Sequence, residues 1–178
     1  MEDREDDPLT SGLAEGNVRA FCALYDRLAG RLYRVAVRLL DCREDAEDAV
    51  QEVFASLVRS RDRLRQVRDL DAYLFASLRR AAARLAVRRA RLPTASDAGL
   101  PEAVARPDRQ GEGGLPDDLC RALGALPVEQ REVIALKIDG ELTFAEIGLA
   151  MGTSANTAAS RYRYALEKLR QTLGPDGC

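Results

Sequence analysis

Residues 143–173 read TFAEIGLAMGTSANTAASRYRYALEKLRQTL. Thr143 is a good N-cap for a helix that runs to Met151, and Gly152 allows a tight turn after it. Ser154 is a good cap for the next helix. Two helices of this size joined by a glycine turn are typical of a helix-turn-helix, whose second helix can enter the major groove of DNA.

The second of these helices is amphipathic. Its apolar residues recur at helical spacing on one face, namely Ala158, Tyr162, Ala165, Leu166, Leu169 and Leu173. Asn156, Ser160 and Arg163 point away from that face, and small polar donors and arginine near a helix start can reach base edges and phosphates. The alternative is a polar face that is only solvated.

Three earlier segments also carry the helical period. One begins at the candidate cap Asn17 and continues to residue 39, with Gly30 as a candidate break into two helices. The second, residues 46–57, has an acidic outer face. The third runs from residue 74 to 85, and arginines line its outer face and continue beyond it: Arg80, Arg84, Arg88 and Arg91.

The bulk composition agrees with an all-α fold. The 178 residues are 46% hydrophobic and only 5% aromatic, which favours amphipathic helices in two small domains. Between the domains, residues 93–116 lose the helical period and collect proline and glycine, so we predict a flexible linker that lets the domains move independently. The predicted divisions are an acidic tail (1–16), a first domain (17–92), the linker (93–116), a helix-turn-helix domain (117–173) and a C-terminal tail (174–178).

Charge is unevenly distributed along the chain. Residues 1–16 hold one basic and six acidic side chains, whereas residues 17–92 hold seventeen basic and ten acidic ones, a net charge of +7. A basic domain of this kind has the electrostatic character of a phosphate-binding surface, although arginine-rich helix faces are often only solvated. The acidic tail is either a disordered solubilising end or a segment that covers the arginines as DNA would.

Several functional classes are excluded or disfavoured by the residues. No apolar run is long enough for a membrane span and the first residues are acidic, so we expect a cytoplasmic protein. The chain has no histidine and no CxxC pair, which excludes a Cys/His zinc site and a histidine-based triad. There is no phosphate-binding glycine loop and no ligand cluster. We therefore expect no catalytic residue, metal or cofactor, and we expect Cys22 to be a small buried hydrophobe rather than a redox thiol.

Five stretches, in order along the chain, resemble one known family. DAEDAVQEVF at 45–54 looks like the polymerase-binding helix of extracytoplasmic-function (ECF) sigma factors, and DAYLFASLRR at 71–80 resembles their promoter-melting helix. LPVEQREVI at 126–134, followed by FAEIG at 144–148 and by residues 154–169, resembles their second domain, which binds the −35 promoter element. The resemblance covers residues 17–92 and 117–173.

The resemblance implies a role for individual residues. Contact with core RNA polymerase is expected from Asp48, Gln51 and Glu52. Contact with the opening −10 element is expected from Arg79, Arg80, Arg84 and Arg88, and residues 59–69 correspond to the family's loop that captures a flipped base. Contact with the −35 element is expected from Ser154, Asn156, Thr157, Ser160, Arg161 and Arg163. Many members of the family are also held by an anti-sigma partner.

The expected function is therefore that of a sigma factor, which brings core RNA polymerase to promoter DNA and opens it. The alternative is a helix-turn-helix regulator that acts outside the polymerase holoenzyme. Its first domain would then sense a ligand or dimerise, and the acidic helix at residues 45–54 argues against it.

Overall fold

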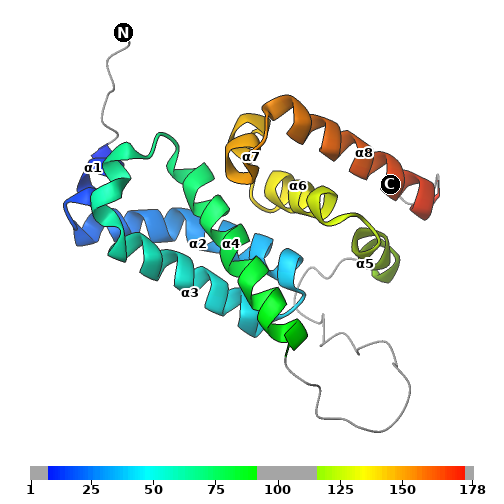
Figure 1. Ribbon diagram of the computed structural model, residues 1–178, viewed down its shortest axis with the longest axis horizontal. Coiled ribbons are helices and arrows are strands. Elements are labelled where there is room, and N and C mark those ends of the chain that lie inside the picture. The colour runs from blue at the N-terminus through cyan, green and yellow to red at the C-terminus, as the bar shows by residue number, and fades with distance from the viewer. Residues whose placement is uncertain (1–7, 92–115, 175–178) are drawn as a thin grey trace, which may run out of the picture.

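A computed structural model describes residues 8–91 and 116–174, and these ranges contain helices and no strand (Figure 1). The helices are α1 Pro8–Ala14, α2 Val18–Leu40, α3 Arg43–Arg59, the 3-10 helix η1 Arg61–Gln66, α4 Leu70–Arg91, α5 Asp117–Gly124, α6 Val128–Ile138, α7 Phe144–Met151 and α8 Ala155–Leu173. The all-α prediction is confirmed. The predicted linker lies outside the described residues except for Pro116, and so does the C-terminal tail beyond Gly174. None of the described helices combines the length and the apolarity that a bilayer span requires.

The first segment forms one helix, not two. α2 runs without a break through Gly30, and Leu24, Leu28 and Leu32 are fully buried on one face of it. A glycine inside a helix costs about 1 kcal/mol relative to alanine, whereas each buried leucine contributes roughly 1.5–3 kcal/mol, so burial on both sides of Gly30 outweighs the break. The same register leaves Cys22 exposed, so the expectation that it is buried was wrong.

The second half of the predicted acidic tail is structured. Pro8–Ala14 forms α1, which packs against η1 and α2, and Leu13 is fully buried there. The backbone N–H of Asn17 bonds to the carbonyl of Gly12 at 2.9 Å and closes the turn into α2. The interpretation of the tail as a disordered end is therefore wrong for residues 8–14. Residues 1–7, which carry five of the six acidic side chains, lie outside the described part.

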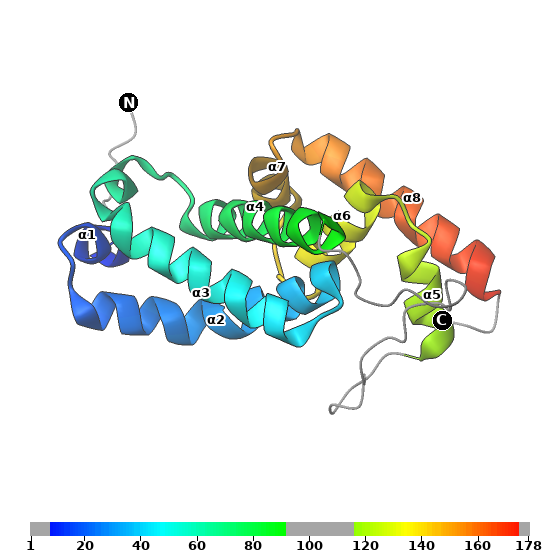
Figure 2. The same cartoon turned by 60° about the horizontal axis from the view of Figure 1, so that its bottom comes forward.

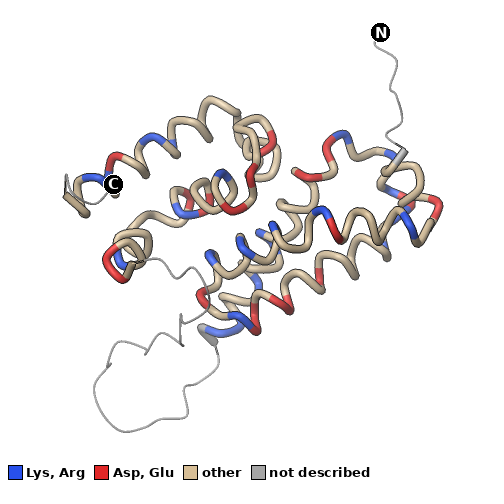
Figure 3. Tube along the Cα trace, turned by 180° about the vertical axis from the view of Figure 1, so that it is seen from behind, with Lys and Arg blue, Asp and Glu red and all other residues tan. Residues whose placement is uncertain are grey.

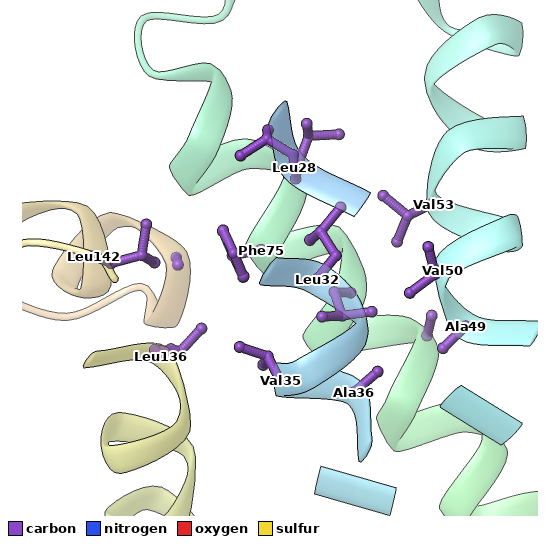
Figure 4. Close-up of a cluster of buried hydrophobic side chains, with 14 of the residues drawn as sticks. Leu28, Leu32, Val35, Ala36, Ala49, Val50, Val53, Phe75, Leu136 and Leu142 are labelled. Atoms are coloured by element: carbon purple, nitrogen blue, oxygen red, sulfur yellow. The ribbon is translucent and has the colours of Figure 1, made fainter. Parts of the chain in front are cut away.

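The helices form two groups, α1–α4 and α5–α8, that pack against each other (Figures 1 and 2). One continuous apolar cluster joins them: Phe75 of α4 is fully buried with Leu32 of α2, and also with Leu136 of α6 and Leu142 (Figure 4). A smaller cluster lies wholly inside the second group, between α5, α6 and α8. The structure thus shows docked domains where we expected independent ones. Helical periodicity indicates which face is apolar, but not which element covers that face.

Replacing Leu13 tests whether α1 is part of the fold. Leu13→Ala removes a fully buried side chain between α1, η1 and α2, so we expect the free energy of unfolding to fall by about 2–5 kcal/mol. Urea denaturation measures the change. Val18→Ala is the control, since Val18 is 72% exposed and its loss should cost less than about 0.5 kcal/mol. Equal, small effects of both substitutions would show that α1 does not contribute to the fold.

Candidate nucleic-acid and polymerase interfaces

The helix-turn-helix forms as the sequence predicts. Thr143 caps α7 in a reciprocal capping box with Glu146. Gly152 ends α7 in the left-handed region at φ +65°, which glycine adopts without a steric penalty. Ser154 then caps α8, and its hydroxyl accepts the N–H of Thr157 at 3.0 Å.

Close packing fixes the angle between α7 and α8. A Cβ atom on Gly148 would lie only 2.9 Å from the carbonyl oxygen of Thr153 and 3.0 Å from the nitrogen of Ala155, so the turn requires a glycine here. The rings of Phe144 and Tyr162 also pair across the two helices, with centroids 5.7 Å apart. α8 is therefore held in one orientation by the helix before it.

Three of the six predicted −35 residues form a row on the outer side of α8, in which Asn156 and Arg163 are exposed and Ser160 is half-buried. At 100° per residue, Asn156, Ser160 and Arg163 lie opposite the buried Ala158 and Ala165. The guanidinium of Arg163 donates to the Ser160 hydroxyl at 3.2 Å. This row faces outward from the body of the domain.

The other three predicted residues lie at the start or on the side of α8. Ser154 and Thr157 are exposed, and their hydroxyls hydrogen-bond to each other at 2.8 Å as part of the cap. Arg161 is half-buried on the flank of the helix. These three side chains can add contacts to those of the outward row, but the hydrogen bonds of the cap and the partial burial of Arg161 make them less available to DNA.

On α4, three of the four predicted −10 arginines form a stripe. Arg80, Arg84 and Arg88 recur every four residues and are all exposed. Arg80 donates to Ser77 at 2.9 Å, and Arg84 pairs with Glu52 of α3 at 2.5 Å. Arginines recur along the α2–α4 body with acidic residues between them (Figure 3). An exposed ion pair contributes little to stability, so the Arg84 guanidinium stays available to a phosphate.

The fourth arginine does not belong to the stripe. Arg79 points into the junction between the two helix groups, where it donates to the Ala150 carbonyl at 2.8 Å and pairs with Glu132 at 2.7 Å. Its side chain is only 22% exposed. In this arrangement Arg79 is not free to hold DNA, because its guanidinium is bound to Ala150 and Glu132. The sequence alone did not reveal that α7 would pack against it.

The acidic face of α3 carries the predicted polymerase-binding residues. Asp48 and Gln51 are exposed, while Glu52 is half-buried and paired with Arg84. Beside them the rings of Phe54 and Tyr25 pack at a centroid distance of 4.9 Å. At the start of the helix, a backbone hydrogen bond and then the Cys42 thiol hold the pKa of Glu44 below its ordinary value. The Glu44 carboxylate is therefore anionic at neutral pH.

A second row of arginines was missed from the sequence. Arg31, Arg34 and Arg38 recur about one turn apart on α2, and all three contact residues 139–141 between α6 and α7. Their spacing and the acidic composition of the Asp139-Gly140-Glu141 stretch were visible in the sequence. Only the tertiary structure shows that the two meet.

Comparison with known proteins agrees with this arrangement. Residues 24–92 match the family model for Sigma-70 region 2, and residues 122–171 match that for Sigma-70 region 4. The chain is 33% identical over 165 residues to RNA polymerase sigma factor CarQ of Myxococcus xanthus, covering 90% of this chain and 92% of CarQ. It is 30% identical over 174 residues to ECF RNA polymerase sigma factor SigM of Mycobacterium tuberculosis, covering 97% and 86% of the two chains.

A solved structure is similar as well. The sigma factor RpoE from Bartonella quintana, in a co-crystal structure with the anti-sigma factor NepR, superposes with a TM-score of 0.70 at 28% identity, covering 89% of this chain and 99% of that one. Matches to both sigma regions, in the expected order, run through the two helix groups that carry the arginine stripe and the helix-turn-helix. The chain belongs to the extracytoplasmic-function family of RNA polymerase sigma factors.

Proposed function

We propose that this sigma factor holds core RNA polymerase with α3, the −10 element with α4 and the −35 element with α8. The observation that carries the proposal is that each helix leaves a chemically distinct face exposed: acidic on α3, arginine-rich on α4 and small polar on α8. Residues 17–92 would form the −10 domain and residues 117–173 the −35 domain. The chain supplies specificity and strand opening through binding energy and carries out no catalysis, and it acts in the cytoplasm.

On α8 we assign two different tasks. Asn156 and Ser160 lie near the start of the helix and face outward, so they read base edges. Arg163 follows Asn156 by seven residues, about 10 Å along the axis, and grips a phosphate. Ser154, Thr157 and Arg161 support this contact from the cap and the flank.

On α4 the exposed arginines Arg80, Arg84 and Arg88 hold the phosphates of the opening −10 region. Arg79 joins them only when the two domains are apart, because it is otherwise bound to Glu132 and Ala150. On α3, Asp48, Gln51 and Glu52 meet the polymerase. Since Glu52 pairs with Arg84, polymerase binding to Glu52 would release a cation for DNA.

We also propose an anti-sigma partner. The Bartonella quintana sigma factor was crystallised with its anti-sigma factor NepR, and this chain shares that fold over 89% of its length. A protein of this kind would keep the factor from core polymerase until a signal releases it.

The function itself is tested by adding the chain to core RNA polymerase and a random promoter library. We expect transcripts that begin at a fixed distance from a shared pair of sequence elements, because the two domains read two sites. Duplex binding without new transcripts would favour the helix-turn-helix regulator. Core polymerase alone is the control.

The acidic face is tested by Asp48→Arg combined with Gln51→Ala, which leaves the Glu52–Arg84 pair intact. We expect holoenzyme formation to fall at least about tenfold, since losing a contact of about 1.4 kcal/mol suffices for that change. Competition for core polymerase in a pull-down measures it. Asp62→Arg makes the same charge change at a residue that is 92% exposed on η1, and it should bind normally. Normal competition by the double variant would remove this face from the polymerase interface.

Arg163→Ala separates phosphate gripping from base reading. If Arg163 grips a phosphate, binding to a matched and to a scrambled −35 duplex should weaken equally, and the slope of log K against log salt should shrink by about 0.9. Fluorescence anisotropy at several salt concentrations measures both quantities. Arg170→Ala removes the same charge from the exposed far end of α8 and serves as the control. A loss confined to the matched duplex would show base reading, and no loss on either would exclude this face of α8 from the interface.

A further inference from the structure

The 3-10 helix η1 is anchored to the first domain by very few of its own side chains. Within it Leu64 alone is fully buried, and the charged or polar side chains around Leu64 are exposed: Arg61, Asp62, Arg63, Arg65 and Gln66. Helices of the 3-10 type have poorer hydrogen-bond geometry than α-helices and are uncommon beyond three or four residues. The conformation of η1 therefore depends on what covers Leu64.

Helix α1 provides that cover. Among the described helices it is the main neighbour of η1, and the two lie side by side at one end of the first domain (Figures 1 and 2). Leu13 of α1 is also fully buried, in the same apolar cluster as Leu64. Because η1 has only one buried side chain, losing the apolar surface around Leu13 would leave the orientation of η1 poorly determined.

The turn after α1 also contacts the arginines of η1. A Cβ atom on Gly16, which has φ +77°, would lie 2.9 Å from Nη1 of Arg61, so this guanidinium rests directly against the turn. Nη2 of Arg65 lies 4.0 Å from the carboxylate of Glu15, and this exposed ion pair adds little stability. Together with Leu13, these contacts place both ends of η1 against α1 and the turn that follows it.

Helix η1 lies within residues 59–69, the segment that we expect to capture a flipped base of the −10 element. Extruding a base costs stacking energy, which contacts in the receiving pocket must offset. A segment that has to become ordered during binding would also lose conformational entropy at each of its residues. An η1 that is already held in place avoids this second cost.

We propose that α1 is a positioning element for base selection: by covering Leu64, it holds η1 in the conformation that receives the flipped base. Specificity at the −10 element then depends on residues 8–16, which precede the proposed −10 domain and lie outside the match to Sigma-70 region 2 at residues 24–92. The proposal rests on the proposed −10 domain and on the expected role of residues 59–69.

The test uses the holoenzyme that the full chain forms with core RNA polymerase. A promoter is first selected with the parent chain from a random library, and every position of its −10 and −35 elements is then varied in one pool. Sequencing the transcripts gives, for each position, the ratio of the yields from the best and the worst base. Because both bases compete in one sample, this ratio does not depend on how much of a variant is folded.

We expect Leu13→Ala to lower the ratio at one −10 position at least about threefold and to leave every −35 ratio unchanged. That fall follows if the fraction of η1 in the receiving conformation drops from nearly all to about a third. Leu13→Met nearly conserves the side-chain volume and should keep the parent ratio. Leu32→Ala makes the same deletion at a fully buried residue in the middle of α2, and it should alter no −10 ratio.

Unchanged −10 ratios in Leu13→Ala would reduce α1 to a stabilising element and overturn the proposal. An equal fall in Leu32→Ala would overturn it as well, since a general loosening of the domain would then be sufficient. If Leu13→Ala forms no holoenzyme, Leu13→Val removes less volume and is judged by the same ratios.

A substitution in η1 itself separates this inference from the assignment on which it rests. Arg63→Ala with Gln66→Ala changes two exposed side chains of η1, and we expect it to alter the ratio at the same −10 position as Leu13→Ala. No change at any −10 position would show that η1 does not select a base, and the inference would fall with that assignment. A change here, combined with unaltered ratios in Leu13→Ala, would refute the role of α1 alone.

Discussion

The guanidinium of Arg31 is the contact on which the arrangement of this molecule depends. It donates to the Gly140 carbonyl, pairs with Asp71 of α4 at 2.9 Å and lies over the Phe75 ring at 5.6 Å. One side chain of α2 therefore ties together α4 and the turn between α6 and α7. At 18% exposure its charge is partly desolvated, and such a charge is tolerated only when it is fully partnered. Burial of apolar side chains between the two domains favours docking but specifies no orientation. The directional contacts of Arg31 fix how the two domains are aligned.

Most of the local structure could be predicted from the sequence. The caps Thr143 and Ser154, the turn at Gly152 and the buried faces of α3, α4 and α8 follow from short-range rules that act within one or two turns of helix. The sequence-based predictions were wrong where packing against an element distant in the sequence determines the local structure. Gly30 remains helical because leucines on both sides of it are buried, and Leu13 orders α1 because η1 lies beneath it.

In the candidate site, too, local patterns predicted some residue positions, whereas others depend on tertiary packing. The sequence placed Arg80, Arg84 and Arg88 on an outer face correctly, because helical spacing alone decides that placement. It could not place Arg79, which differs from its neighbours only in being covered by α7 and Glu132. A composition rich in proline and glycine predicted the break between the domains, but no local pattern specifies that two separate domains will dock.

Docking places side by side the surfaces that we propose for the two promoter elements, so under that proposal the closed form and the promoter-bound form differ in the distance between the domains. Pulsed electron resonance between spin labels at Val18 and Glu167, in a chain whose native cysteines are replaced by alanine, measures that distance. The account predicts a single distance in the free chain and a distance tens of ångströms longer when the holoenzyme is bound to a promoter selected from a library. The same distance distribution in both states would contradict it.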